Sequence, residues 1–199
     1  MSVQELYEYL RSPSFLDAKS GNIFYNYYIY QYPAKQEYKM RSQIEDFKER
    51  LKRPSSSANA MILDLFSTFC EFLKSETFGK QTLLDMTFEE DKKHPEMVTE
   101  ELTSEASNDK FFAFVHRKIK KYIEEDDGLS KPYIFICGIG KMFPYLRCNV
   151  FLTGYEKYND TNLYRIILFY PGHCEGNSYS LFDTMHDDHT YRATLLVND

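Results

Sequence analysis

Short apolar runs alternate with amphipathic stretches along most of this chain, and this alternation constrains the fold more than any other feature. The strand-like runs are 22–32, 60–65, 133–137, 163–169 and 192–197. Strands separated by stretches of helical length need crossover connections, which favour a mainly parallel sheet. We therefore predict one α/β domain over residues 1–199, a Rossmann-like sandwich. The short link before the last strand favours an antiparallel edge there.

Proline or a capping residue marks the ends of the predicted helices. Ser12-Pro13 ends a first helix that buries Val3, Leu6 and Leu10, and Pro33 begins the helix that buries Met40 to Leu51. His94-Pro95 interrupts a weakly periodic region at 67–107. Asp109 caps the helix that buries Phe112 to Ile123, and Pro144 begins the last helix. These boundaries predict helices on both sides of the sheet.

Composition narrows the function classes. The formal charge of −6 argues against nucleic acid or an anionic membrane as the main partner, so direct DNA contact is not expected. No run of 18 apolar residues is present, and the first 15 residues lack the apolar segment of a signal peptide. The four cysteines show no CxxC spacing, which favours reduced thiols over disulfides. A cytoplasmic protein is the resulting expectation.

Four predicted turns follow strands and are expected to meet at one edge of the sheet. They are Tyr32-Pro33, Asp64-Leu65, Gly138-Ile139-Gly140 and Tyr170-Pro171-Gly172. Ligands of open α/β sheets bind at this carboxyl edge. Tyr170-Pro171-Gly172 is expected to end its strand and to open a polar loop that runs to Phe182, a place for recognition or chemistry.

The turn from Gly138 to Gly140 has some features of a phosphate-binding loop. A P-loop needs four residues between its glycines and a Ser or Thr after its lysine, whereas here the glycines are two apart and Met142 follows Lys141. A third glycine of the dinucleotide fingerprint is also missing, because Phe143 stands in its place. A tight strand-to-helix turn fits better, and anion binding at the next helix is the alternative. The candidate cofactor-binding residues are Gly138, Gly140, Gly172 and Ser178.

Other polar clusters favour ordinary structural roles over chemistry. Adjacent residues rarely face one another, so His173-Cys174-Glu175 is weak evidence for a nucleophilic Cys174. The segment from His186 to His189 has metal-ligand chemistry but fits a solvated turn. The basic stretch 116–121 fits a solvated helix face, with an acidic partner or a phosphate backbone as the alternative. Arg192, inside the last strand, is expected to form an ion pair.

The C-terminal residues carry a family resemblance. The string FYPG-x3-G-x-S-x-x-LF over 169–182, followed by YRA-x-x-L from Tyr191, resembles the C-terminal signature of the BrxB family. Looser matches cover most of the chain, among them Asp64-Leu65-Phe66 and the run from Cys137 to Gly140 with Leu146-Arg147. The chain departs from the family at Cys174-Glu175-Gly176, where an aromatic and an acidic residue usually precede the glycine. It departs again at Asp183, where glycine is common.

The resemblance implies a core component of BREX bacteriophage-exclusion systems, needed for phage defence and for the accompanying host DNA methylation. It implies no enzymatic activity, cofactor or metal, and its expected partners are other BREX proteins, above all PglZ. We therefore predict a non-enzymatic subunit that acts by protein–protein docking. The alternative is a regulatory protein that binds a nucleotide or phosphate ligand through Gly138 to Gly140 and the loop from Tyr170 to Ser178.

Overall fold

A parallel β-sheet lies at the centre of the molecule. The computed structural model describes residues 2–12, 15, 27–52, 59–125, 132–161, 163–175, 178–187 and 194–195. The central strands are β1 (Tyr27–Tyr32), β2 (Ala60–Asp64), β5 (Tyr133–Cys137), β6 (Arg165–Glu175) and β9 (Thr194–Leu195). They lie in the order β2-β5-β6-β1-β9, and each neighbouring pair is parallel. The predicted α/β class and mainly parallel sheet are confirmed.

The prediction of an antiparallel last strand is wrong. Strand β9 pairs with β1 in parallel, with Tyr28 opposite Thr194 and Ile29 opposite Leu195. The link from β6 is not a simple loop, because it contains two further strands, β7 (Ser178–Leu181) and β8 (Met185–Asp187). These strands pair antiparallel in a meander, β6-β7-β8. Two reversals restore the chain direction of β6 before the chain reaches β9.

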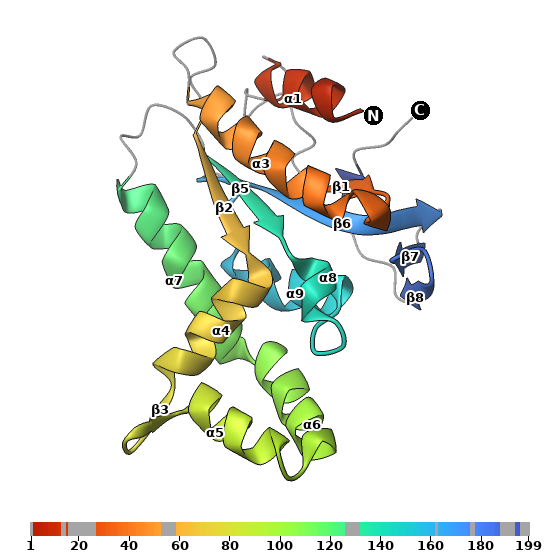
Figure 1. Cartoon of the computed structure of the whole chain (residues 1–199). Helices are drawn as coiled ribbons and strands as arrows, with labels where there is room; N and C mark the ends of the chain where they lie inside the picture. The colour runs from red at the N-terminus through yellow and green to blue at the C-terminus, as the bar shows by residue number, and fades with distance from the viewer. Residues whose placement is uncertain are drawn as a thin grey trace.

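Helices cover both faces of the sheet (Figure 1). The helices on one face are α1 (Val3–Arg11) and α3 (Glu37–Leu51), with the short η1 (Ala34–Gln36) before α3; those on the other are α4 (Leu65–Ser75), α7 (Asp109–Glu125), α8 (Ile139–Met142) and α9 (Cys148–Tyr155), which continues into η2 (Glu156–Tyr158). Side chains alternate between the two faces of a strand. In β5, Ile134 and Ile136 join the core under α4 and α7, whereas Tyr133 and Phe135 join the core under α1 and α3.

Several predicted helix ends are confirmed and three are shifted. Pro33, predicted as the first residue of a helix, instead precedes η1, and α3 begins at Glu37. Helix α1 begins with a capping box at Ser2 and ends at Arg11, and α3 ends at Leu51. Asp109 is the first residue of α7 rather than its cap, and the side chain of Asn108 accepts a hydrogen bond from the Lys110 amide (3.0 Å). No helix starts at Pro144. Its predecessor Phe143 is extended, as steric contact with a proline ring favours, and α9 begins at Cys148.

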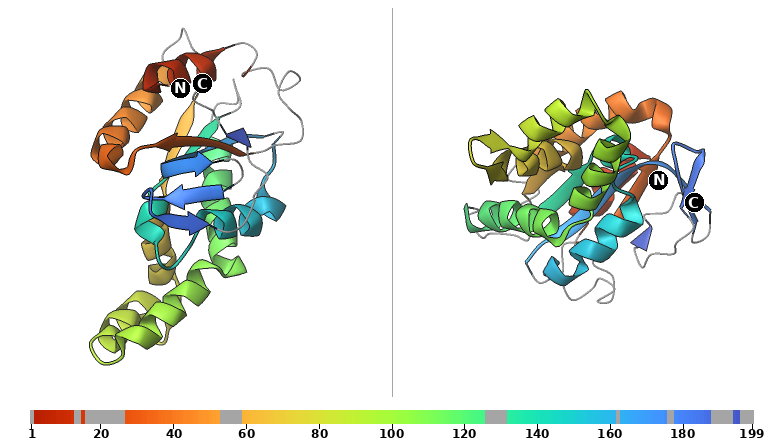
Figure 2. Two further views of the ribbon diagram at one scale, coloured as in Figure 1. Left: turned by 90° about the vertical axis from the view of Figure 1, so that its right-hand side faces the viewer. Right: turned by 90° about the horizontal axis from the view of Figure 1, so that it is seen from below.

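The first part of the weakly periodic region belongs to the core helix α4, and the rest forms an arm, which we define as residues 77–106. It consists of the hairpin β3 (Thr77–Phe78) and β4 (Gln81–Thr82), then α5 (Leu83–Asp91) and α6 (Pro95–Ala106). Thr82 caps α5 through a capping box, and Pro95 is the first residue of α6, as the predicted break at His94-Pro95 requires. The arm extends away from the sheet beyond α4 and α7 (Figures 1 and 2).

The prediction that Tyr170-Pro171-Gly172 ends its strand is wrong, because β6 continues to Glu175. Pro171 is the last residue of the parallel ladder with β1, where the missing amide hydrogen disrupts little. Its carbonyl accepts a hydrogen bond from the Phe182 amide (2.9 Å). Gly172 then pairs with Leu181 at φ 154°, a conformation that favours glycine. Pairing with β7 therefore overrides the local signal for a break.

Candidate functional site

The turns at the carboxyl edge meet as predicted. Asp64 at the end of β2 is in register with Cys137 at the end of β5, and Tyr32 is in register with Pro171. A Cβ atom on Gly138 would lie 3.0 Å from both carboxylate oxygens of Asp64. One on Gly140 would lie 3.1 Å from Cγ of Pro171. The parallel topology thus places four distant segments in contact.

Asp64 connects two helices at this edge. Its carboxylate caps α4 by accepting a hydrogen bond from the Ser67 amide (2.9 Å), and it also accepts one from Lys141 Nζ. Burial on its own would raise the pKa of Asp64, but the hydrogen bonds from Lys141 and Ser67 outweigh it and lower the pKa. The carboxylate therefore stays ionised and joins the start of α4 to α8.

The turn from Gly138 to Gly140 contacts groups of its own chain. Gly138 has a left-handed φ of 78°, and the Asp64 carboxylate lies directly beside it and occupies the space next to this turn. The Phe182 ring covers Gly140, since a Cβ there would lie 2.6 Å from the ring's Cζ atom. Helix α8 that follows has only four residues. These contacts favour a packed strand-to-helix turn, and the phosphate-binding role of Gly138 and Gly140 stays a prediction.

On the other side of the edge, Tyr32, Glu37 and Arg41 form a hydrogen-bonded cluster. The Tyr32 hydroxyl donates to Glu37, whose carboxylate also accepts a hydrogen bond from Arg41 Nε (2.9 Å).

Burial, with the nearby Asp64 charge, raises the pKa of the Cys137 thiol to about 12. A thiol with that pKa stays protonated at neutral pH and is a poor nucleophile.

The meander contains the other candidates. In the backbone ladder Cys174 is opposite Tyr179 and Ser178 is opposite Glu175, so the predicted polar loop is mostly strand. His186 and Asp187 belong to β8, whereas Asp188, His189 and Arg192 lie outside the described residues. Within the described part of the chain, no three His, Cys, Asp or Glu side chains are grouped to hold a metal ion.

The tight turn between β7 and β8 has an unusual backbone. Phe182 and Asp183 both have positive φ, 55° and 63°, which non-glycine residues rarely adopt. Asp183 Oδ1 lies 2.8 Å from Nδ1 of His173 on β6, which holds the turn against the sheet. This conformation explains a glycine preference at position 183, and Asp is among the residues that tolerate it best.

The basic segment of α7 is paired with acidic residues. Lys118 pairs with Glu71 on α4, Lys120 with Glu124 and Lys121 with Glu125. The Arg117 guanidinium lies 5.5 Å from the centre of the Phe114 ring. Local carboxylates therefore offset the positive field that a phosphate backbone would need, which fits the prediction of a solvated face.

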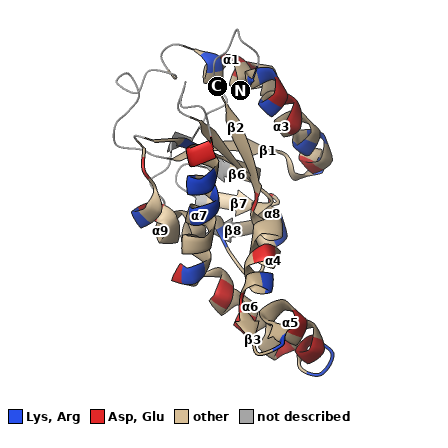
Figure 3. Ribbon diagram, turned by 90° about the vertical axis from the view of Figure 1, so that its left-hand side faces the viewer, with Lys and Arg blue, Asp and Glu red and all other residues tan. Residues whose placement is uncertain are grey.

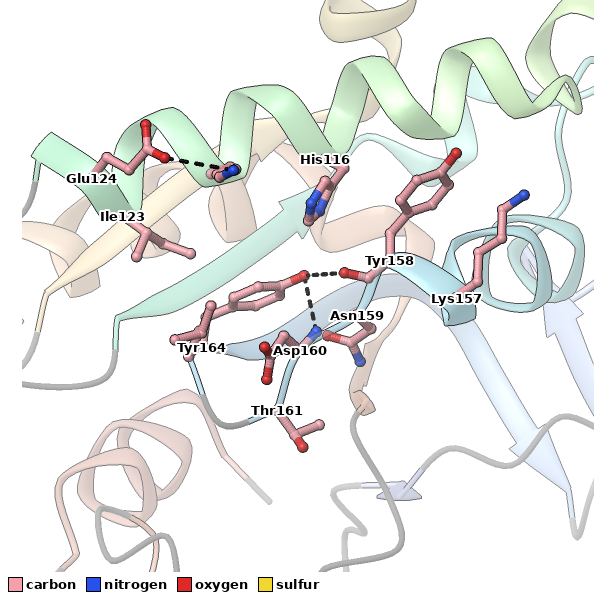
Figure 4. A pocket seen from close by; sticks show the side chains of 11 residues that line it. His116, Ile123, Glu124, Lys157, Tyr158, Asn159, Asp160, Thr161 and Tyr164 are labelled. Carbon is pink, nitrogen blue, oxygen red and sulfur yellow. Dashed lines mark hydrogen bonds and ion pairs between the residues drawn. The ribbon is translucent and has the colours of Figure 1, made fainter.

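The sequence reasoning missed a pocket of about 600 Å³ at the opposite, amino edge of the sheet. It opens between α7 and the segment that joins η2 to β6, and His116, Lys120, Tyr158, Asn159 and Tyr164 are among its lining residues (Figure 4). This volume is in the range of small-ligand pockets. The polar string from Asn159 to Thr161 before an apolar strand is a sequence signal that could have drawn attention to it.

Most polar groups of this pocket have intramolecular partners. The Tyr164 hydroxyl donates to the Tyr158 carbonyl (3.1 Å) and accepts from the Asp160 amide (3.4 Å). The Asn159 side chain differs, because its oxygen and nitrogen are buried and form no hydrogen bond with the described residues. Burial and the charge of Lys120 lower the pKa of His116, which keeps this imidazole neutral at pH 7.

These features define an α/β sandwich with hydrogen-bonded polar clusters at its carboxyl edge, a meander after its central strand and a projecting arm. Residues 61–196 match the family model described as BREX protein BrxB. A protein of Bacillus cereus (strain H3081.97), named BREX protein BrxB, is 26% identical over 200 residues, covering 98% of this chain and 96% of that protein. No solved structure matches the chain. The chain belongs to the BrxB family and is thereby a component of a BREX system, which confirms the resemblance and a role in phage exclusion. No helix in the described ranges has the length and apolar character needed to cross a bilayer.

Proposed function

We propose that this protein is a non-enzymatic, cytoplasmic subunit that docks onto PglZ and thereby supports phage exclusion and host DNA methylation. Membership of the BrxB family supports a role among other BREX proteins. The observation that carries the docking role is the pairing of polar groups at the carboxyl edge. Asp64 is committed to Lys141 and to the cap of α4, and Glu37 to Tyr32 and Arg41.

This pairing matters because enzymes of this architecture place their reactive groups at that edge. A catalytic acid, base or nucleophile needs a reactive atom that points at a substrate and is not already engaged within the protein. Here the carboxylates of Asp64 and Glu37 form hydrogen bonds with other residues of the protein, and the Cys137 thiol stays protonated. Such an edge stabilises a scaffold, and a scaffold contributes to a defence system through the surfaces that it presents to partners.

Co-expression of the tagged protein with its native operon tests the proposal. PglZ is expected to co-elute with the tagged protein in size-exclusion chromatography and to be identified by mass spectrometry. Co-expression of the tagged protein with PglZ alone, without the other genes of the operon, is the control for indirect capture. Deletion of the gene for this protein should abolish both phage exclusion and the host methylation pattern. A protein that elutes alone, together with unchanged defence after deletion, would rule out the docking role.

A regulatory protein that binds a nucleotide or phosphate ligand is the second candidate. The Asn159 amide in the amino-edge pocket has no hydrogen-bond partner among the described residues, which favours a small ligand there rather than at Gly138 to Gly140. A thermal-shift screen with ATP, GTP and inorganic phosphate discriminates, since ligand at 100 times its Kd stabilises the folded state by about 2.7 kcal/mol. Asn159→Leu should cancel a shift that arises in the pocket, and Gly140→Ala one that arises at the turn. A flat screen would remove this candidate.

A further inference from the structure

The arm, residues 77–106, exposes large apolar side chains that the core does not use. Of the eight large hydrophobic residues exposed in the described chain, four belong to the arm: Phe78, Met86, Phe88 and Met97. Phe88 is 60% exposed and Phe78 58%. Scattered exposed hydrophobics are normal, but half of them on one short projecting segment indicates a contact surface.

The exposed residues lie on more than one side of the arm. Leu83 and Thr87 form the buried face of α5, and with 3.6 residues per turn Met86 and Phe88 flank that face on opposite sides. Phe78 is opposite Gln81 in the hairpin, and Gln81 Nε2 donates to Glu89 on α5 (3.2 Å). The hairpin side and the Phe88 side therefore both present an aromatic ring. A partner that covers both would enclose the arm in a groove.

The arm also carries nearly all of the protein's net charge. It contains eight Asp and Glu residues and three Lys residues, a formal net charge of −5 out of −6 for the whole chain. The remaining 169 residues contain 22 acidic and 21 basic residues. Figure 3 shows acidic residues along α5 and α6, and Glu96, Glu100 and Glu101 form no ion pair with the described residues.

We propose that the arm is the docking element of this protein, and that it inserts into an apolar groove rimmed by Lys and Arg on a partner protein. This inference rests on the proposed function and specifies its surface. The apolar rings supply the buried centre of such an interface, and the carboxylates of Glu96, Glu100 and Glu101 supply a polar rim that selects a basic partner. A second copy of this chain is a poor occupant, because two arms of charge −5 would repel each other.

Binding to purified PglZ, measured by calorimetry or biolayer interferometry with the full chain, tests the arm. Phe78→Ser and Phe88→Ser should each weaken the complex at least tenfold, as expected for aromatic residues at an interface centre. The matched control is Tyr38→Ser on α3, since Tyr38 is 84% exposed and lies outside the arm. It should leave binding unchanged. Circular dichroism of every variant confirms that these exposed substitutions preserve the fold.

Charge reversal tests the rim. Glu100→Lys should weaken binding several-fold at low salt and lose this effect at high salt. The exposed Glu45 on α3 provides the matched Glu45→Lys control, which should bind like the unaltered protein.

If the unaltered protein forms no complex with PglZ, the proposed function fails and the docking role of the arm with it. If the complex forms but arm variants bind as tightly, the arm alone is excluded. A homodimer in light scattering that Phe88→Ser disrupts would assign the arm to self-association and overturn the inference.

Discussion

At the scale of single residues, Asp64 shows how one side chain can be fixed by several structural roles. It ends β2, caps α4, pairs with Lys141 and lies against Gly138. A residue with these roles is expected to matter for stability whether or not a ligand binds nearby. Its two main contacts can be separated by substitution, because asparagine retains a capping oxygen but carries no charge.

We therefore predict that Asp64→Asn lowers the free energy of unfolding by about 1 kcal/mol and that Asp64→Ala lowers it by about 2 kcal/mol. The lowered pKa of Asp64 adds a pH dependence. The contribution of the charge is present above the unfolded-state pKa of about 4 and is lost as pH falls through the lower folded-state pKa. Urea unfolding at pH 7 and at pH 3 measures both effects. An Asn variant with the same deficit at both pH values would contradict the ion-pair contribution.

At the scale of elements, the β6-β7 pairing depends on Gly172. Its φ of 154° favours glycine, and a Cβ there would lie 2.1 Å from the carbonyl oxygen of Ser180. That oxygen belongs to the backbone of the paired strand, so a clash cannot be relieved by a side-chain rotation. The close approach thus explains why the chain has glycine after Pro171.

Gly172→Ala is predicted to destabilise the protein by about 3 kcal/mol through strain and overlap together. Gly79→Ala is the control, since Gly79 also has a positive φ, 66°, but a Cβ there would meet nothing within 4 Å. The control should cost only about 1–2 kcal/mol. Thermal and urea unfolding compare the two variants. Equal losses would show that backbone strain, rather than contact with β7, determines the requirement.

Element predictions from the sequence succeeded where the local pattern was strong. The run at 60–65 is short and almost wholly apolar, and the run at 133–137 is apolar and rich in β-formers. Residues 60–64 and 133–137 are strands in the structure, and Leu65 begins α4. The two-residue strands β3 and β4 are too short to show any periodicity. At Pro171 a local break was overridden by β7, a partner whose pairing no local pattern reveals.

The candidate site was harder to predict than the elements. Convergence of the turns at the carboxyl edge follows from strand direction alone, so it could be foreseen. The partners there could not, because the ion pair joins Asp64 and Lys141 across 77 positions of the sequence. The amino-edge pocket has the same origin, since His116 comes from α7 and Asn159 from the segment before β6.

At the scale of the whole molecule, the arm is less firmly held than the sheet. Helix α5 buries Leu83 and Thr87, and α6 buries Val98 and Ala106, whereas all five residues of β5 are buried. Regions with few buried contacts open at lower free energy than the core. Amides in α5 and α6 should therefore exchange with deuterium faster than those in β5 and β6. Helix α7, with four buried residues, is the helical control and should resemble the sheet. Uniform protection across arm and sheet would contradict this order.

The separation of charge described above makes the charge distribution of the protein asymmetric, with its negative end at the arm. A body with 22 acidic and 21 basic residues experiences little net force from a charged neighbour, while the arm experiences almost all of it. Within a Debye length, about 8 Å at physiological salt, a positively charged surface would exert a torque that turns the molecule arm first. The rate of productive encounter would then rise without any added contact, because orientation would precede collision.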